Sequence, residues 1–214
     1  CDNSPEVPDV PQTTEAPNDA MPSSMTSDQT MPEAANDQAD PLPMQSLSDV
    51  INHERRAERA ARDMFRNPQA TLAFFGLEPN MTVVEVSPGG GWYTDILAPY
   101  LKNGGGTLYA AHFSPDAEGY FANSLTSFKE KYMSNTEEYG SINLTVFSPE
   151  ADGVAPDGVA DMVLTFRNVH NWGEEFSAKA FADFYDALKP GGVLGVVDHR
   201  LPEDATPTPD CGYN

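Results

Sequence analysis

The spacing of apolar residues divides the chain at about residue 47. Before that point the side chains that build a core are scarce, and after it they recur at helical spacing or in short β-branched runs. The pattern predicts one globular domain over residues 47–214, preceded by a segment over residues 1–46. That segment holds nine acidic residues, eight prolines and no lysine or arginine, so it cannot bury enough apolar area to offset its ordering entropy, and we expect a disordered tether.

Within the domain, helical and strand patterns alternate. Ser46 and the apolar spacing after it predict a first helix that runs to Arg66, and Pro68 begins a second helix that ends at Gly76. Further helices are expected over residues 92–101, 114–132 and 174–188, and buried strands over residues 81–86, 107–113, 142–147, 160–166 and 193–197. Repeated β-α-β units with right-handed crossovers give an α/β fold, a Rossmann-like, doubly wound and mainly parallel sheet of five strands.

Four arginines share one face of the first predicted helix, namely Arg55, Arg59, Arg62 and Arg66. One interpretation is a solvated face on which Glu58 supports Arg62 through an i,i+4 pair. The other interpretation is a face that meets an anion.

A glycine-rich turn over residues 87–91 joins the first strand to the helix that follows it. Glycines let the backbone approach a ligand closely, and the N–H groups at a helix start favour polar or anionic groups. Ligands of such sheets bind beyond the carboxyl ends of the strands. The turn is therefore the first candidate for a binding site.

The charge balance restricts the partners. The chain carries 33 acidic and 12 basic side chains, a net charge of −21, which excludes nucleic acid because a phosphate backbone needs a cationic face. No apolar run approaches the roughly 18 residues of a membrane-spanning helix. The two cysteines, Cys1 and Cys211, predict no disulfide framework, and no metal-site spacing is present, so we expect no metal.

The chain begins at Cys1 rather than at a methionine, ahead of the polar, Pro-rich segment. This start resembles a mature bacterial lipoprotein, whose signal peptide is cut immediately before the lipid-modified cysteine. The resemblance implies lipid attachment at Cys1, a place in the bacterial cell envelope on its periplasmic or surface side, and membrane contact through that lipid only. The alternative is an arbitrary fragment.

Two motifs resemble the class I S-adenosylmethionine (SAM)-dependent methyltransferases. Residues 83–91 are similar to that superfamily's first motif, an apolar run, an acidic residue and spaced glycines, and residues 188–194 are similar to its entry into the fifth strand. The similarity covers about residues 47–200. Shorter segments at residues 74–77, 90–93, 96–100 and 166–172 resemble a bacterial group known mainly as predicted methyltransferases.

The resemblance implies SAM as the cofactor. It places the methionine and ribose side of SAM against Glu85, Ser87, Gly89, Gly90 and Gly91. His112 stands where the superfamily normally has an acidic residue that binds both ribose hydroxyls, and Ser87 stands where glycine is usual. Glu85 has a second interpretation, a structural carboxylate that holds the turn.

An acceptor pocket is expected at residues 166–172, which leave the fourth strand over the same edge of the sheet. His170 is the candidate general base near neutral pH, and Asn168 is a candidate catalytic partner that orients a polar group. The other pocket candidates are Trp92, Tyr93, Arg167, Asn171 and Trp172. The alternative for His170 and Asn171 is that they cap the next helix and satisfy turn backbone.

The superfamily closes its sheet with a further helix and strand pair, whereas this chain ends soon after its fifth strand. We therefore expect that strand pair to be missing and an open edge beside residues 193–197 that could pair with a second copy as a dimer. Three functions stay open: methyl transfer from SAM to a small molecule, membrane-tethered ligand binding without catalysis, and NAD-dependent oxidation and reduction. The NAD fingerprint is incomplete because Thr94 occupies the position of its third glycine.

Overall fold

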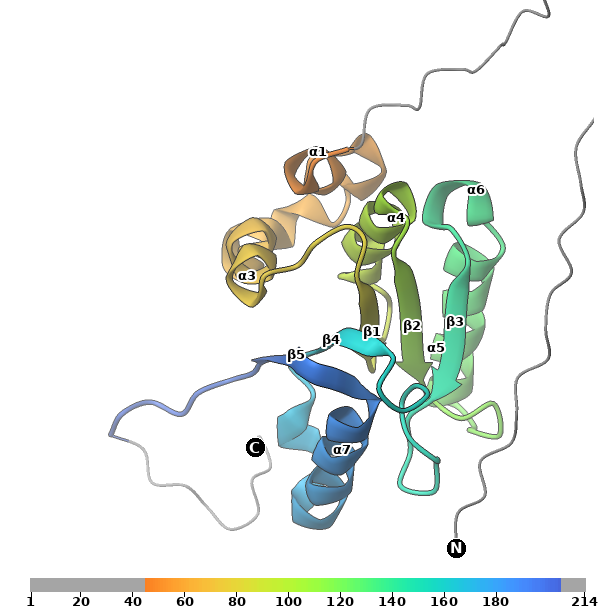
Figure 1. The fold of residues 1–214 in the computed structure, drawn as a ribbon, viewed down its shortest axis with the longest axis vertical. Coiled ribbons are helices and arrows are strands. Elements are labelled where there is room, and N and C mark those ends of the chain that lie inside the picture. The colour runs from red at the N-terminus through yellow and green to blue at the C-terminus, as the bar shows by residue number, and fades with distance from the viewer. Residues whose placement is uncertain (1–44, 205–214) are drawn as a thin grey trace, which may run out of the picture. The chain divides into compact units, whose positions relative to one another are not determined.

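The computed structural model describes residues 45–204, which form a parallel sheet with helices on both faces (Figure 1). The sheet order is β3-β2-β1-β4-β5, and every neighbouring pair is parallel. The strands are β1 (Thr82–Val86), β2 (Thr107–His112), β3 (Ile142–Val146), β4 (Ala160–Phe166) and β5 (Leu188–Val197). The predicted five-stranded, doubly wound α/β fold is confirmed. The expected tether, Cys1 and Cys211 lie outside the described residues, apart from the last two positions of the tether.

The chain runs outward from β1 to β2 and β3, and then returns to build β4 and β5 on the other side of β1. The strand order therefore reverses between β1 and β4, where Val84 pairs with Val163. In open parallel sheets, ligands bind at such a reversal, outside the carboxyl ends of the strands. We call this side of the sheet the carboxyl edge.

Strand residues alternate between two cores. Val83, Leu108 and Met162 face one core, which includes α1 (Leu47–Ile51), α3 (Pro68–Phe75), α4 (Thr94–Gly104), α5 (Tyr120–Phe128) and α6 (Thr136–Tyr139). Val84 and Val163 face the other core, which is covered by α7 (Gly173–Ala187). Figure 1 shows α7 on the side of the sheet opposite α1, α3 and α4. In residues 45–204, no helix is long and apolar enough to span a membrane.

The prediction of one continuous first helix is wrong. Residues 47–66 form α1, two 3₁₀ turns (Glu54–Arg56 and Ala60–Arg62) and the short α2 (Asp63–Arg66). The physical reason is a set of side chains that bind nearby backbone and end the helix. Asn52 donates to the Ser48 carbonyl, and the buried Arg56 donates to the Ile51 carbonyl and to Asp63.

Two other helix starts also differ from the prediction. Ser114 does not start the next helix, because its hydroxyl accepts from the Asp116 N–H in a local turn and α5 begins only at Tyr120. The fourth helix begins at Thr94 rather than residue 92. Helix α3 does end at Gly76, which has φ 78° as expected for a glycine cap.

All five strands were predicted to be buried, and this is wrong for the two edge strands, β3 and β5. β3 and β5 each pair with one neighbour within the described residues, and most of their side chains are half-buried or exposed. In β5, Val193 and Val196 are each 38% exposed. The expected open edge beside residues 193–197 is therefore present in residues 45–204.

Candidate functional site

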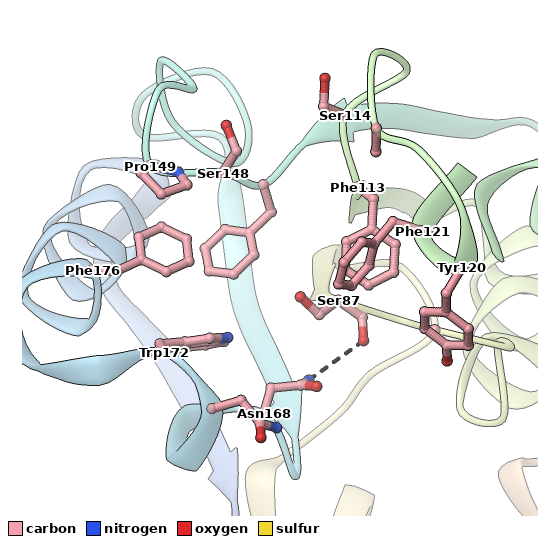
Figure 2. A pocket seen from close by; sticks show the side chains of 14 residues that line it. Ser87, Phe113, Ser114, Tyr120, Phe121, Ser148, Pro149, Asn168, Trp172 and Phe176 are labelled. Atoms are coloured by element: carbon pink, nitrogen blue, oxygen red, sulfur yellow. Dashed lines mark hydrogen bonds between the residues drawn. The ribbon is translucent and has the colours of Figure 1, made fainter. Parts of the chain in front are cut away.

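A pocket of about 670 Å³ lies at the carboxyl edge, over the ends of β1, β2, β3 and β4. Figure 2 shows Trp172 and Phe176 on one side of it, Phe113, Tyr120 and Phe121 on the other, and Ser87 and Asn168 between them. Its polar side chains are Ser87, Ser114, Ser148, Asn168 and Asn171. Within the described residues, none of the side chains that line the pocket is charged. The pocket therefore suits a ligand with flat apolar parts and hydrogen-bonding groups.

The glycine loop, residues 87–91, forms the β1 side of this pocket. Ser87, Gly89 and Gly91 all have positive φ, at 51°, 56° and 72°. A Cβ on Gly89 would meet no atom within 4 Å, so this glycine leaves open space on the pocket side of the loop. A Cβ on Gly91 would lie 2.4 Å from the Tyr132 ring, so Gly91 is required by packing inside the protein.

Asn168 joins the two strands that flank the reversal. Its side-chain amide donates to the carbonyls of Val86 (3.3 Å) and Ser87 (3.4 Å) and to the Thr165 hydroxyl (3.1 Å). Figure 2 draws the bond between Asn168 and Ser87 across the floor of the pocket. The predicted catalytic Asn168 thus lines the pocket and also fixes the distance between β1 and β4.

Glu85 lies beneath the glycine loop rather than in the pocket. Its carboxyl group is buried and accepts from the Thr94 hydroxyl at 2.6 Å. Burial raises its pKa to about 7, with a smaller increase from Asp95, while the Thr94 hydrogen bonds act in the opposite direction. The geometry matches the structural interpretation of Glu85, a carboxyl group that holds the start of α4.

His112 uses both ring nitrogens on backbone. Nδ1 accepts from the Phe113 N–H at 2.8 Å, which puts the ring proton on Nε2, and Nε2 donates to the Gly89 carbonyl at 3.2 Å. Burial lowers the pKa of the imidazole, only partly offset by the bond to Gly89. In this arrangement His112 holds the glycine loop and offers neither nitrogen to a ribose hydroxyl, in contrast to the role that the family resemblance implied.

Two predicted pocket residues lie elsewhere. Trp92 is 7% exposed, donates to the Arg59 carbonyl and has the guanidinium groups of Arg56 and Arg66 5.0 and 4.6 Å from its ring. Tyr93 is buried and stacks on Phe166 with ring centroids 3.5 Å apart. Neither side chain lines the pocket. Residues 56–66 cover this turn, a contact that no local pattern reveals, and the role of Trp92 and Tyr93 toward an acceptor stays a prediction.

One acidic residue that the sequence pattern did not single out holds the residues that pack over this turn. Asp95 is completely buried in the first turn of α4, where its carboxylate meets Arg59 at 2.8 Å, Lys131 at 3.1 Å and the Tyr139 hydroxyl at 3.1 Å. Arg59 also donates to the Gly90 carbonyl. The only signal was an aspartate inside an otherwise apolar helix. Arg59 therefore meets an anion within the protein, whereas Arg62 is exposed as the solvated interpretation required.

The segment after β4 places its residues in two directions. Asn171 and Trp172 line the pocket beside Asn168, as predicted. His170 instead meets Asp198 after β5, with 2.7 Å between Nδ1 and Oδ1, and does not line the pocket. Arg167 is exposed, has φ 62° and uses its N–H on the Val197 carbonyl. The roles of His170 and Arg167 toward an acceptor stay predictions.

Comparison with solved structures identifies the architecture. A SAM-dependent methyltransferase from Aquifex aeolicus is similar over 79% of this chain and 81% of its own, with 22% identity and a TM-score of 0.51. The fold is that of the class I methyltransferases. No protein-family profile and no curated protein matches the sequence.

Two other solved structures are less similar to the chain. A putative SAM-dependent methyltransferase from Methanococcus maripaludis has 16% identity and a TM-score of 0.43, over 71% of this chain and 63% of its own. Human N-acetylserotonin methyltransferase, solved with SAM, has 18% identity and a TM-score of 0.48, over 74% of this chain and 40% of its own. The chain thus spans less than two thirds of both these proteins.

Proposed function

We propose that this protein binds SAM in the pocket at the carboxyl edge and transfers its methyl group to a small-molecule acceptor. The observation that carries the proposal is the position of the pocket. It lies at the strand reversal of a methyltransferase fold, directly against a glycine loop whose Gly89 leaves space for a ligand.

The residues present suit such a cofactor. Phe113, Phe147 and Trp172 offer flat apolar surfaces for a base, and Ser87 and Ser148 offer hydroxyls. The lining side chains are uncharged, so the charged methionine end of the cofactor would depend on backbone groups of the glycine loop. When bound, SAM supplies an electrophilic methyl group, and the protein contributes mainly proximity and alignment.

Asn168 and Asn171 are the groups that we propose to orient the acceptor. Both lie on the β4 side of the pocket, opposite the β2 side formed by Phe113. Their amides can hold a hydroxyl, amine or carboxylate, while Trp172 adds an apolar wall.

A second candidate function is ligand binding without methyl transfer. The internal contacts of Glu85 and His112 favour it, because two side chains expected to hold the cofactor are used on the protein's own backbone and hydroxyl groups. Such a protein would still bind a ligand in the pocket but would turn nothing over.

Calorimetric titration with SAM, S-adenosylhomocysteine and NAD tests the proposal. Binding of SAM and S-adenosylhomocysteine should be lost in Gly89→Val and retained in Gly105→Val. Gly105 is a matched control because it has φ 77° and no atom within 4 Å, yet lies at the other end of α4. The absence of binding at millimolar SAM in the wild type would refute the SAM proposal, and heat with NAD alone would support an NAD-binding protein.

A further inference from the structure

Three metal-ligating side chains meet at the carboxyl ends of β4 and β5. His170 lies in the 3₁₀ turn after β4 (Val169–Asn171), and Asp198 and His199 directly follow β5. One ligand atom from each residue lies within 4.8 Å of the other two. No local sequence pattern reveals this cluster, because parallel pairing of β4 with β5 brings residues 28 positions apart together.

The carboxylate of Asp198 is held in place at this cluster. It accepts from the His170 ring at 2.7 Å, from the His170 N–H at 3.2 Å and from the His199 N–H at 2.7 Å. The group is therefore a carboxylate at neutral pH, with its oxygens directed at the two histidines.

The two imidazoles approach each other at the same point. The rings of His170 and His199 have centroids 5.0 Å apart and are inclined by 72°. His170 is anchored by Asp198, and the His199 side chain is on the surface. Ligand atoms that share one ion at about 2.0–2.1 Å lie roughly 3.3 Å apart in a tetrahedral site, so a shift of about 1.5 Å completes the site.

We propose that His170, Asp198 and His199 bind one divalent transition-metal ion. Two imidazole nitrogens and one carboxylate favour Zn²⁺ or Fe²⁺ over Mg²⁺ and Ca²⁺, which prefer oxygen ligands alone. Three protein ligands leave coordination positions open, as in catalytic rather than structural zinc sites. The site lies next to the pocket residues Asn168 and Asn171 on the same turn, and its metal binding does not depend on SAM.

Zinc titration of the full chain, stripped with a chelator, tests the site by calorimetry and equilibrium dialysis. We expect one Zn²⁺ per chain, with affinity lowered at least about tenfold in Asp198→Asn and in His199→Ala. His199 is exposed, so that variant should fold. His53→Ala is the matched control, because His53 precedes the first 3₁₀ turn (Glu54–Arg56) and is not part of the cluster. This variant should bind Zn²⁺ with unchanged affinity.

A cysteine control separates this site from a thiol site. A variant with Cys1→Ser and Cys211→Ser should bind Zn²⁺ as the wild type does. Co²⁺ should give visible absorption bands that His199→Ala weakens and the cysteine variant retains. The proposal is overturned if the wild type shows no saturable Zn²⁺ binding, if His199→Ala binds as tightly as the wild type, or if the cysteine variant alone loses the ion.

Discussion

The glycine loop after β1 and the segment after β4 flank the same reversal but are supported differently. Each contains a non-glycine residue at positive φ, Ser87 at 51° and Arg167 at 62°. In the loop, three side chains from elsewhere in the chain hold the glycine carbonyls: His112 on Gly89, Arg59 on Gly90 and Tyr132 on Gly91. The segment at 166–172 is held by a different set of contacts: the Asn168 amide on β1, the Arg167 N–H on the Val197 carbonyl, and His170 on Asp198.

The difference indicates separate roles for the two sides of the pocket. Because all three glycine carbonyls are bonded within the protein, the loop has its shape before any ligand binds, which lowers the entropic cost of binding. The β4 segment is more exposed, with Arg167 and Asn171 on the surface. We infer that cofactor binding depends on the loop and acceptor choice on the segment.

The largest expected effect comes from Asp95, the buried anchor of Arg59. Asp95→Asn should cost about 3–5 kcal/mol of unfolding free energy, because it leaves Arg59 and Lys131 without their shared buried partner. Urea unfolding measures it. Glu203→Gln, in a pair with Arg200 that is exposed on both sides, should change nothing measurable. Equal losses of unfolding free energy in the two variants would contradict the proposed importance of Asp95 as the partner of Arg59.

Gly91 tests whether the loop is fixed by packing. Gly91→Ala places a Cβ against the Tyr132 ring at positive φ and should cost about 2–4 kcal/mol. Gly105→Ala has the same backbone strain without a neighbour, so it should cost only about 1 kcal/mol. Thermal unfolding compares them, and a similar loss in both variants would mean that backbone strain alone explains Gly91.

The buried acid beneath the loop predicts a pH effect of defined sign. Glu85 has a folded pKa of about 7, above the usual value of 4.5, so its protonated form stabilises the fold and that stability is lost as pH rises toward and past 7. Glu85→Gln cannot ionise and so avoids this loss. The unfolding free energy of the variant, relative to that of the wild type, should therefore be higher at pH 8 than at pH 5. Unfolding in urea at both pH values measures this, and a difference that does not depend on pH would count against the assignment.

His112 should act in the opposite direction. Its folded pKa is lowered, so its contribution is complete above the ordinary histidine range and is lost as pH falls through it. The two groups therefore oppose each other: stability is lost through His112 as pH falls below the ordinary histidine pKa, and through Glu85 as pH rises from about 4.5 to about 7. His112→Gln should reduce the acid-side loss in the same urea experiment.

The smallest expected effect is relief of backbone strain at the two positive-φ residues. Ser87→Gly should raise the unfolding free energy by up to about 1 kcal/mol, since glycine accepts this conformation without a Cβ penalty. Arg167→Gly should give a similar change on the other side of the reversal. A clear loss of stability in Ser87→Gly would show that the serine side chain contributes more than the strain costs.

Local patterns predicted the strands and the parallel sheet, because burial on both sides of a sheet leaves runs such as residues 160–166 that match the structure to the residue. They could not predict what the arginines bind, since Arg59 and Asp95 meet only through the folded chain. For the same reason the uses of His112 and His170 were missed. Their partners, Gly89 and Asp198, are chosen by strand register and not by neighbours in sequence.

The two tryptophans allow the most direct test of the binding site. Trp172 lines the pocket, whereas Trp92 lies outside it, with its indole N–H on the Arg59 carbonyl. In ¹H–¹⁵N spectra the chain should give two indole signals, assigned with Trp172→Phe. Titration with S-adenosylhomocysteine should shift the Trp172 signal and leave the Trp92 signal in place. No shift of Trp172 at millimolar ligand, or a shift of Trp92 alone, would contradict binding in this pocket.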